Sequence, residues 1–334
     1  MPSAPLTTPS SGIDLSVVII SWNTLQMTRE CLESLFASLQ KTPDLRAEVI
    51  LVDNASSDGS DDMVAAEFPE VILIRNQDNR GFAAANNQGF DIAQGRQILL
   101  LNSDTISHGS VIGDSLRWLD QNPEAGAMGC RVLNTDGTVQ RTCSMYPSLI
   151  NLMLLTSGLW KLSWPRFLGR YQISDWDRDS EREVGVISGC YLLLRRQVLE
   201  EVGPLDDSFF FFGEETDWCK RIHDAGWKLV FTPVGEITHH GGGSVKKLNH
   251  KRDIMLSEGT VRLHRKHGGL LGGLAAFSII ALFNLSRAGF WSLAALLKRG
   301  VKPGTGEQDR TQERARHFRA VVANSRAIWP EMVK

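Results

Sequence analysis

The 334-residue sequence lacks the features that mark several common classes of protein. None of its five cysteines forms a CxxC pair, which argues against a structural zinc site or a disulfide framework and favours a reducing compartment. The net charge of −2 gives no indication of nucleic-acid binding. Residues 1–13 carry neither a basic segment nor an apolar run, so we expect a disordered lead-in rather than a signal peptide, and a cytoplasmic protein.

The sequence also lacks both common glycine-rich phosphate loops. No GxGxxG follows the first apolar run, and GxxxxGK[ST] occurs nowhere. The sequence therefore lacks the backbone loop that holds the phosphates in dehydrogenase-type and P-loop nucleotide sites, which argues against both kinds of site. A diphosphate bound here would need another source of positive charge, and a divalent cation can supply it.

Short apolar runs alternate with amphipathic stretches in the first hundred residues. The runs predict strands at 15–21, 48–53, 71–74 and 97–102. Helical spacing of apolar residues, or a turn-rich start, predicts helices over 27–39, 61–68 and 81–93. Such alternation is typical of an α/β fold with a mostly parallel, Rossmann-like sheet and flanking helices.

Polar residues end the predicted strands and should meet at one edge of the sheet. They are Ser21-Trp22-Asn23, Asp53-Asn54 and Asn102-Ser103-Asp104. Ligands of open α/β sheets gather at this edge. Asp53 can accept hydrogen bonds from a base or a ribose, or it can simply close a turn. Asp104 can hold a divalent cation, or it can cap the next helix.

The second half is less regular, with a strand and hairpin expected over 125–145, an irregular segment over 146–183 and a buried strand over 184–194. Four phenylalanines then precede Gly213, so Glu214 and Glu215 should begin a helix beneath an apolar wall. Such a wall raises the pKa of a carboxyl group, which suits a general base. Acidic residues also favour helix starts through the macrodipole. Arg221 can pair with Asp217 or bind phosphates.

Several of these stretches together resemble family 2 glycosyltransferases, in particular bacterial rhamnosyltransferases and galactofuranosyltransferases. The matching segments are SVVIISWN, LVDNASSDGS, NRGFAAANNQG and LLNSD, in that order, and the resemblance spans 14–245. It implies a GT-A fold, a dTDP- or UDP-sugar donor, Mg²⁺ or Mn²⁺, and inversion at the anomeric carbon.

The resemblance also implies roles for individual residues. Asp104 would bind the metal and His239 would complete the metal site, with Asn102 in place of the first aspartate of the family's Asp-x-Asp motif. Glu215 would be the catalytic base, although Glu214 is the alternative, and Asp217 would order the site. Donor binding would involve Ser21, Trp22, Asn23, Asp53, Asn54, Gly81, Phe82, Asn86, Asn102, Ser103 and Arg221.

The last part of the chain, 246–334, differs in composition. Seven basic residues lie between Lys246 and His267, and the apolar stretch that follows, through 297, is interrupted by Asn284 and Arg287. We expect two short helices there, lying on the cytoplasmic leaflet, with the basic residues against anionic headgroups. A dimer-forming helix pair and a membrane span are the alternatives. A polar amphipathic helix is expected over 310–326.

We therefore expect an inverting, metal-dependent glycosyltransferase on the inner face of the plasma membrane. It would transfer rhamnose, or alternatively galactofuranose or another hexose, to a hydroxyl group of a polysaccharide or a polyprenyl-linked glycan in cell-surface glycan synthesis. A nucleotidyltransferase and a non-catalytic nucleotide-sugar-binding scaffold are the alternatives.

Overall fold

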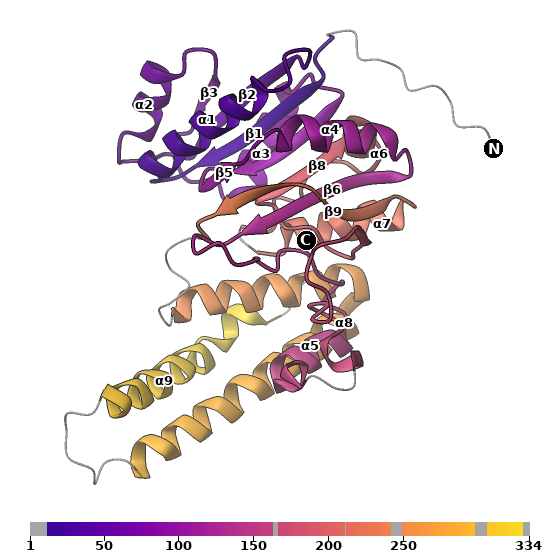
Figure 1. Cartoon of the computed structure of the whole chain (residues 1–334). Coiled ribbons are helices and arrows are strands. Elements are labelled where there is room, and N and C mark those ends of the chain that lie inside the picture. The colour runs from indigo at the N-terminus through magenta and orange to yellow at the C-terminus, as the bar shows by residue number, and fades with distance from the viewer. Residues whose placement is uncertain (1–11, 163–165, 211, 242–248, 298–305, 330–334) are drawn as a thin grey trace. The chain divides into compact units, whose positions relative to one another are not determined.

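The computed structural model describes residues 12–162, 166–210, 212–241, 249–297 and 306–329 (Figure 1). The chain divides into two compact units. The first contains 1–146, 175–210 and 214–242, and the second contains 147–174, 211–213 and 243–334. Most of the expected lead-in, 1–11, lies outside the described residues. The division assigns 147–174 to the second unit, although the resemblance to family 2 glycosyltransferases, and with it the expected catalytic domain, spans 14–245.

The first unit begins with the predicted alternation of strands and helices. Four parallel strands lie in the order β3-β2-β1-β4. They are β1 (Leu15–Ser21), β2 (Ala47–Asp53), β3 (Ile72–Arg75) and β4 (Gln97–Asn102). Their connecting helices are α1 (Leu25–Leu39), α2 (Ser60–Glu67) and α3 (Phe82–Ile92). The predicted elements in this half are confirmed to within two residues.

The remaining strands turn the sheet into a mixed one. Strand β8 (Tyr191–Arg195) is antiparallel to β4, and β6 (Ala125–Leu133) is antiparallel to β8. Strand β9 (Lys228–His239) runs parallel to β6, and two short strands, β5 (Thr105–Ser107) and β7 (Arg182–Glu183), pair antiparallel with it. The predicted strand over 184–194 is wrong in its first part, because a turn at Gly189 and Cys190 delays β8 until Tyr191.

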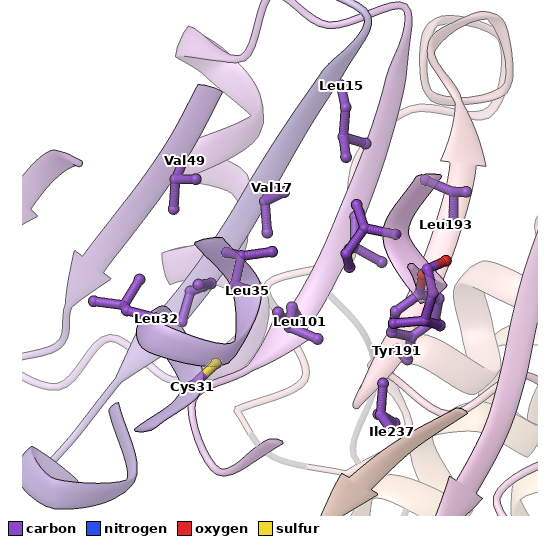
Figure 2. Close-up of a cluster of buried hydrophobic side chains, with 14 of the residues drawn as sticks. Leu15, Val17, Cys31, Leu32, Leu35, Val49, Leu101, Tyr191, Leu193 and Ile237 are labelled. Carbon is purple, nitrogen blue, oxygen red and sulfur yellow. The ribbon is translucent and has the colours of Figure 1, made fainter. Parts of the chain in front are cut away.

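A single hydrophobic cluster fills one side of this sheet. Alternate residues of β1, including Leu15 and Val17, point to α1, where Leu32 and Leu35 are fully buried (Figure 2). Helix α4 (Val111–Gln121) contributes Leu116 to the same cluster. The period-two pattern of a strand and the stripe of an amphipathic helix therefore meet in one core.

Helix α3 covers the opposite side of the sheet. A Cβ at Gly89 would lie 2.4 Å from Cγ1 of Val18, so the helix approaches β1 too closely for a larger residue. Phe90 stacks on Trp218 of α7 (Glu214–Asp224), with ring centroids 5.5 Å apart. Helix α6 (Arg196–Val202) follows β8 directly. The Phe90–Trp218 contact therefore links α3 to the helix that carries Glu214 and Glu215.

The second unit is helical and has a small core of its own. It contains α5 (Leu149–Ser157), η1 (Leu159–Lys161), η2 (Arg166–Gly169), α8 (His250–Leu297), α9 (Gly306–Ala323) and η4 (Ser325–Ile328). Helix α5 contradicts the expectation of an irregular 146–183. Ser148 caps it by accepting a hydrogen bond from the Asn151 amide, and Leu152 packs against Val261 and Ala276 of α8. The apolar residues of α5 surround the helix, so they show no helical period.

Helix α8 is interrupted at Gly269, where φ is 64° and ψ is −165°. The expected break at Asn284 and Arg287 is wrong, because both polar residues are accommodated within the helix. Asn284 donates a hydrogen bond to the Ile280 carbonyl, and the guanidinium of Arg287 lies over the ring of Phe283. Within the described residues α8 alone is long and apolar enough to cross a membrane, which by itself is weak evidence of a span.

Replacing Leu35 with alanine tests the packing of the first unit. Because Leu35 is fully buried between α1 and the sheet, Leu35→Ala should lower the free energy of unfolding by about 2–5 kcal/mol. The matched change Ile92→Ala, at an exposed helical position of the same unit, should cost less than about 1 kcal/mol. Denaturant unfolding of both variants measures the difference, and equal losses would contradict the assigned core.

Candidate active site

The register of β1 with its two neighbours sets the positions of the polar strand ends. Ser21 of β1 lies beside Asp53 of β2, and Ile20 lies beside Asn102 of β4. Asp53 and Asn102 are therefore separated by one strand, or about 10 Å. The strand ends gather at one edge of the sheet, where α/β folds bind ligands.

Asp53 has one oxygen engaged and one available. Its side chain is buried, and Oδ2 accepts a hydrogen bond of 2.8 Å from the Ser56 amide. Oδ1 is also buried and has no hydrogen-bond partner among the described residues. Such an acceptor is costly unless something donates to it. Asp53 therefore closes the turn through Oδ2, which is one of the two roles predicted from the sequence. Its Oδ1 can still accept a hydrogen bond from a base or a ribose.

The loops after β1 and β2 hold each other in place. Asn23 adopts a left-handed conformation (φ 54°), and its Oδ1 accepts a hydrogen bond from the Ser57 amide. The Ser21 hydroxyl lies 3.1 Å from that of Thr28, which places it inside the loop network. Trp22 between them is 53% exposed. It is therefore the residue of this loop with a large free surface.

Asn54 joins β2 to the segment before α3. Its amide nitrogen donates to Oδ1 of Asn79 and to the Gly81 carbonyl, and its oxygen accepts from the Arg80 amide. Gly81 has a positive φ of 81°, and a Cβ there would lie 2.6 Å from the Phe210 carbonyl. Glycine is therefore required at this position by both backbone conformation and space.

The start of α3 contacts the phenylalanine segment that precedes α7. The Phe82 amide donates a 3.3 Å hydrogen bond to the Phe210 carbonyl. Asn86 is buried, and its side chain donates to the Phe82 carbonyl within the helix. The contact fixes the chain just ahead of the two glutamates.

Asp104 and His239 meet although 134 residues separate them in the sequence. Strands β5 and β9 pair so that Thr105 lies opposite His239. Oδ1 of Asp104 is 3.2 Å from Nε2 of His239. Nδ1 of the same imidazole lies 2.7 Å from Oε1 of Gln140, and Nδ2 of Asn102 lies 3.4 Å from Nε2.

This arrangement fits two ligands of a divalent cation. A hydrogen bond from Nδ1–H to Gln140 leaves the lone pair of Nε2 on the side of Asp104, as metal-binding histidines require. Carboxylate and imidazole together suit Mn²⁺ as well as Mg²⁺. Among the described residues no third His, Cys, Asp or Glu joins the pair. Further ligands would have to come from the bound molecule or from water.

Glu214 and Glu215 differ sharply in their surroundings at the start of α7. Glu214 is 4% exposed, and its Oε2 has no hydrogen-bond partner in the described part of the chain. Burial, with a smaller contribution from the neighbouring Glu215 carboxylate, raises the pKa of Glu214 to about 9. Glu215 is only partly buried. Glu214 therefore carries a proton at neutral pH and cannot accept another.

Gly189 connects Glu215 with the end of β4. A Cβ at Gly189 would lie 3.2 Å from Cζ of Phe82 and 4.0 Å from Cβ of Glu215. The next residue, Cys190, accepts a hydrogen bond of 3.2 Å from the Asn102 amide. One short turn therefore contacts both the segment with Asp104 and the helix with Glu215.

Asp217 and Arg221 form a structural pair on the buried side of α7. Asp217 is fully buried, and its Oδ2 accepts a hydrogen bond of 2.9 Å from Nε of Arg221. Arg221 also donates to the carbonyls of Val202 and Pro204. Of the two predicted roles of Arg221, the geometry favours pairing over phosphate binding.

Two residues of the candidate site, Gln140 and Gly189, were not predicted from the sequence. Gln140 orients His239, but it lies after a turn whose sequence gives no indication of that contact. Gly189 lies within the stretch that the sequence predicted as one continuous buried strand, and its neighbours in the structure are Phe82 and Glu215. Ser103 lies 3.2 Å from the Thr24 hydroxyl, within the β1 loop network.

The chain is similar in sequence to known proteins of glycan synthesis. N-acetylglucosaminyl-diphospho-decaprenol L-rhamnosyltransferase of Mycobacterium tuberculosis is 29% identical over 229 residues, which are 63% of this chain and 71% of that protein. O-antigen biosynthesis protein RfbC of Myxococcus xanthus is 27% identical over 240 residues, 69% of this chain but only 17% of that protein.

Among solved structures, mannosyltransferase PcManGT from Pyrobaculum calidifontis in complex with GDP-Man and Mn²⁺ has a TM-score of 0.54 at 17% identity. The match covers 95% of this chain and 88% of that chain, and it supports the predicted GT-A fold. The model of the family described as glycosyl transferase family 2 matches residues 16–203. More than half of the chain fits this model, which excludes the nucleotidyltransferase alternative. The protein therefore belongs to glycosyl transferase family 2.

Proposed function

We propose that this glycosyltransferase inverts the anomeric carbon, depends on a divalent cation, and takes its sugar from a nucleoside-diphosphate donor. The observation that carries the proposal is the approach of Asp104 Oδ1 and His239 Nε2 to 3.2 Å at the carboxyl edge of the sheet. A carboxylate and an oriented imidazole form a cation site beside the strand ends where a diphosphate would lie.

The donor would lie across the ends of β2, β1 and β4. The unpartnered Oδ1 of Asp53 would accept a hydrogen bond from the base or the ribose, and dTDP and UDP are the nucleotides we propose. Trp22 offers an exposed ring nearby in the chain for stacking. When bound at Asp104 and His239, Mg²⁺ or Mn²⁺ would offset the negative charge of the leaving diphosphate.

Glu215 is the general base of the proposed reaction. It would take the proton from an acceptor hydroxyl while that oxygen bonds to the anomeric carbon and the bond to the diphosphate oxygen breaks. Attack opposite the leaving group inverts the configuration. Glu214, which holds its own proton, would donate a hydrogen bond to Glu215 or to the acceptor instead of accepting a proton.

Rhamnose is the proposed sugar, with galactofuranose or another hexose as the alternative. The Mycobacterium relative is named as an L-rhamnosyltransferase acting on a diphospho-decaprenol-linked N-acetylglucosamine, which supports rhamnose and a polyprenyl-linked acceptor here. The RfbC relative supports a polysaccharide product. We propose that residues 14–245 carry catalysis and that the reaction occurs at the cytoplasmic face of the plasma membrane.

Removing the Asp104 carboxylate should abolish metal-assisted donor binding. Calorimetric titration of the wild-type protein with UDP or dTDP should show at least about tenfold tighter binding with Mn²⁺ than without it. Asp104→Ala should lose this gain. Asp44→Ala, which removes an exposed carboxylate, should retain it. A metal effect that survives in Asp104→Ala would overturn the assigned site.

The two glutamates give a matched test of the general base. Glu215→Gln should lower kcat by about 10²–10⁴-fold, because proton transfer from the acceptor is lost. Glu214→Gln replaces an already neutral carboxyl group with a neutral amide and should lower kcat by less than about tenfold. Steady-state rates with donor binding measured alongside would distinguish them. The reverse order would make Glu214 the base.

The raised pKa of Glu214 also predicts a pH dependence of stability. The folded protein keeps this proton up to about pH 9, whereas the unfolded chain releases it near the ordinary value of 4.5. Stability therefore falls as pH rises between these limits. The thermal midpoint of Glu214→Gln should rise relative to wild type as pH increases from 5 to 9. Glu70→Gln, at an exposed site, should run parallel to wild type.

A further inference from the structure

Helices α8 and α9 of the second unit pack side by side and run antiparallel. Three aromatic contacts show this direction, because residue numbers fall from Trp329, just after η4, through α9 as they rise along α8. The contacts are Phe277 with Trp329 (4.9 Å), Phe283 with Phe318 (6.1 Å) and Trp291 with the Arg314 guanidinium (4.6 Å). Figure 1 shows both helices. The contacts extend along α8 from Phe277 to Trp291.

One face of this apolar part of α8 is buried and formed largely of small residues. Gly272, Ala276, Ile280, Asn284 and Ala288 recur at intervals of four and are buried. Four-residue spacing places them in one row along the helix. Small side chains let a neighbouring helix approach closely.

The opposite face, which we name the leucine face, is exposed and apolar. It comprises Leu271, Leu282, Leu285, Leu293 and Leu296, each more than half exposed. No Asp, Glu or Lys occurs between 270 and 297, and the one arginine, Arg287, has its guanidinium over Phe283. A helix whose outer side faces water normally carries charge there. A continuous apolar face of this length indicates a contact surface.

The arginines of α9 are incompatible with a membrane-spanning position of α8. Helix α9 exposes Arg310, Arg314, Arg316 and Arg319, and it packs along the same segment of α8. If α8 crossed the bilayer, α9 would enter the hydrocarbon with it. Each arginine at the bilayer centre would oppose insertion strongly. Helix α8 therefore does not span as long as this pairing persists.

Charge distinguishes a lipid surface from a second copy of the chain. Residues 246–334 contain 17 Lys and Arg but six Asp and Glu, whereas residues 1–245 contain 19 and 32. Two copies meeting through their leucine faces would offer this excess of positive charge no anionic partner. An anionic bilayer would attract the same residues, at a strength that increases with each Lys or Arg near the surface.

We infer that the α8–α9 pair binds an anionic phospholipid bilayer in the plane of the membrane. The leucine face enters the boundary between headgroups and acyl chains, and the arginines of α9, on the far side of α8 from the lipid tails, stay in the aqueous headgroup region. This attachment does not depend on the nucleotide or sugar of the proposed reaction. It would keep the enzyme on a surface where lipid-linked acceptors are concentrated.

Vesicle flotation with the full-length protein tests the inference. Wild type should float with vesicles of phosphatidylcholine and phosphatidylglycerol, bind vesicles of phosphatidylcholine alone at least about tenfold more weakly, and detach in alkaline carbonate. Leu282→Glu with Leu293→Glu should weaken binding by at least about tenfold. So should Arg310→Gln combined with Arg316→Gln and Arg319→Gln.

The matched control is Ile72→Glu with Ile92→Glu, which adds the same two charges at exposed apolar positions of the first unit and should leave flotation unchanged. Circular dichroism of each variant checks that the helices remain. Resistance to carbonate would indicate a span and overturn the inference. A lipid-free dimer that Leu282→Glu converts to monomer, without vesicle binding by wild type, would assign the leucine face to a second copy and overturn it as well.

Discussion

The hydrogen-bonded register of β1 with β2 and β4 is the constraint on which the site depends. It fixes Asp53 and Asn102 on either side of one central strand, so the loops that follow these strands must share one edge. The Asn54 contacts and the Gly81 turn then tie the next segment to the same edge. A slip of one residue in β1 would turn its buried side chains to the wrong face and move the polar ends apart.

Packing distinguishes Glu214 from Glu215, two neighbouring residues between which the sequence alone does not choose a general base. Glu214 is enclosed and holds its proton, whereas Glu215 lies near Gly189 and Phe82 in a less buried position. The Asp217–Arg221 pair and the Phe90–Trp218 stack fix the helix beneath them. Both residues are glutamates at adjacent positions. The difference in their burial therefore comes from how α7 packs against the rest of the unit.

The sequence predicted the features that repeat and missed those that depend on distant contacts. Alternating apolar runs gave β1 to β4 and their helices because each has a clear period. The sequence also predicted β6, and it predicted β8 with a start that is too early, whereas β9 and α5 show no clear period and were missed. Gln140 contacts His239 across 99 positions of the chain, which no local pattern indicates. Helix α8 is interrupted at Gly269, where the backbone takes a positive φ. Asn284 does not interrupt the helix, because its side-chain amide donates to a carbonyl of the same helix.

Because β5 pairs with β9, the geometry of the proposed cation site does not depend on the length of chain between Asp104 and His239. Asp104 and His239 keep their distance through three rungs of a ladder, and the residues between these strands include the turn at 134–138 and all of α5. Insertions or deletions there would leave the two ligands in place. A chain built in this way can vary in the segments between the two strands while Asp104 and His239 keep their separation.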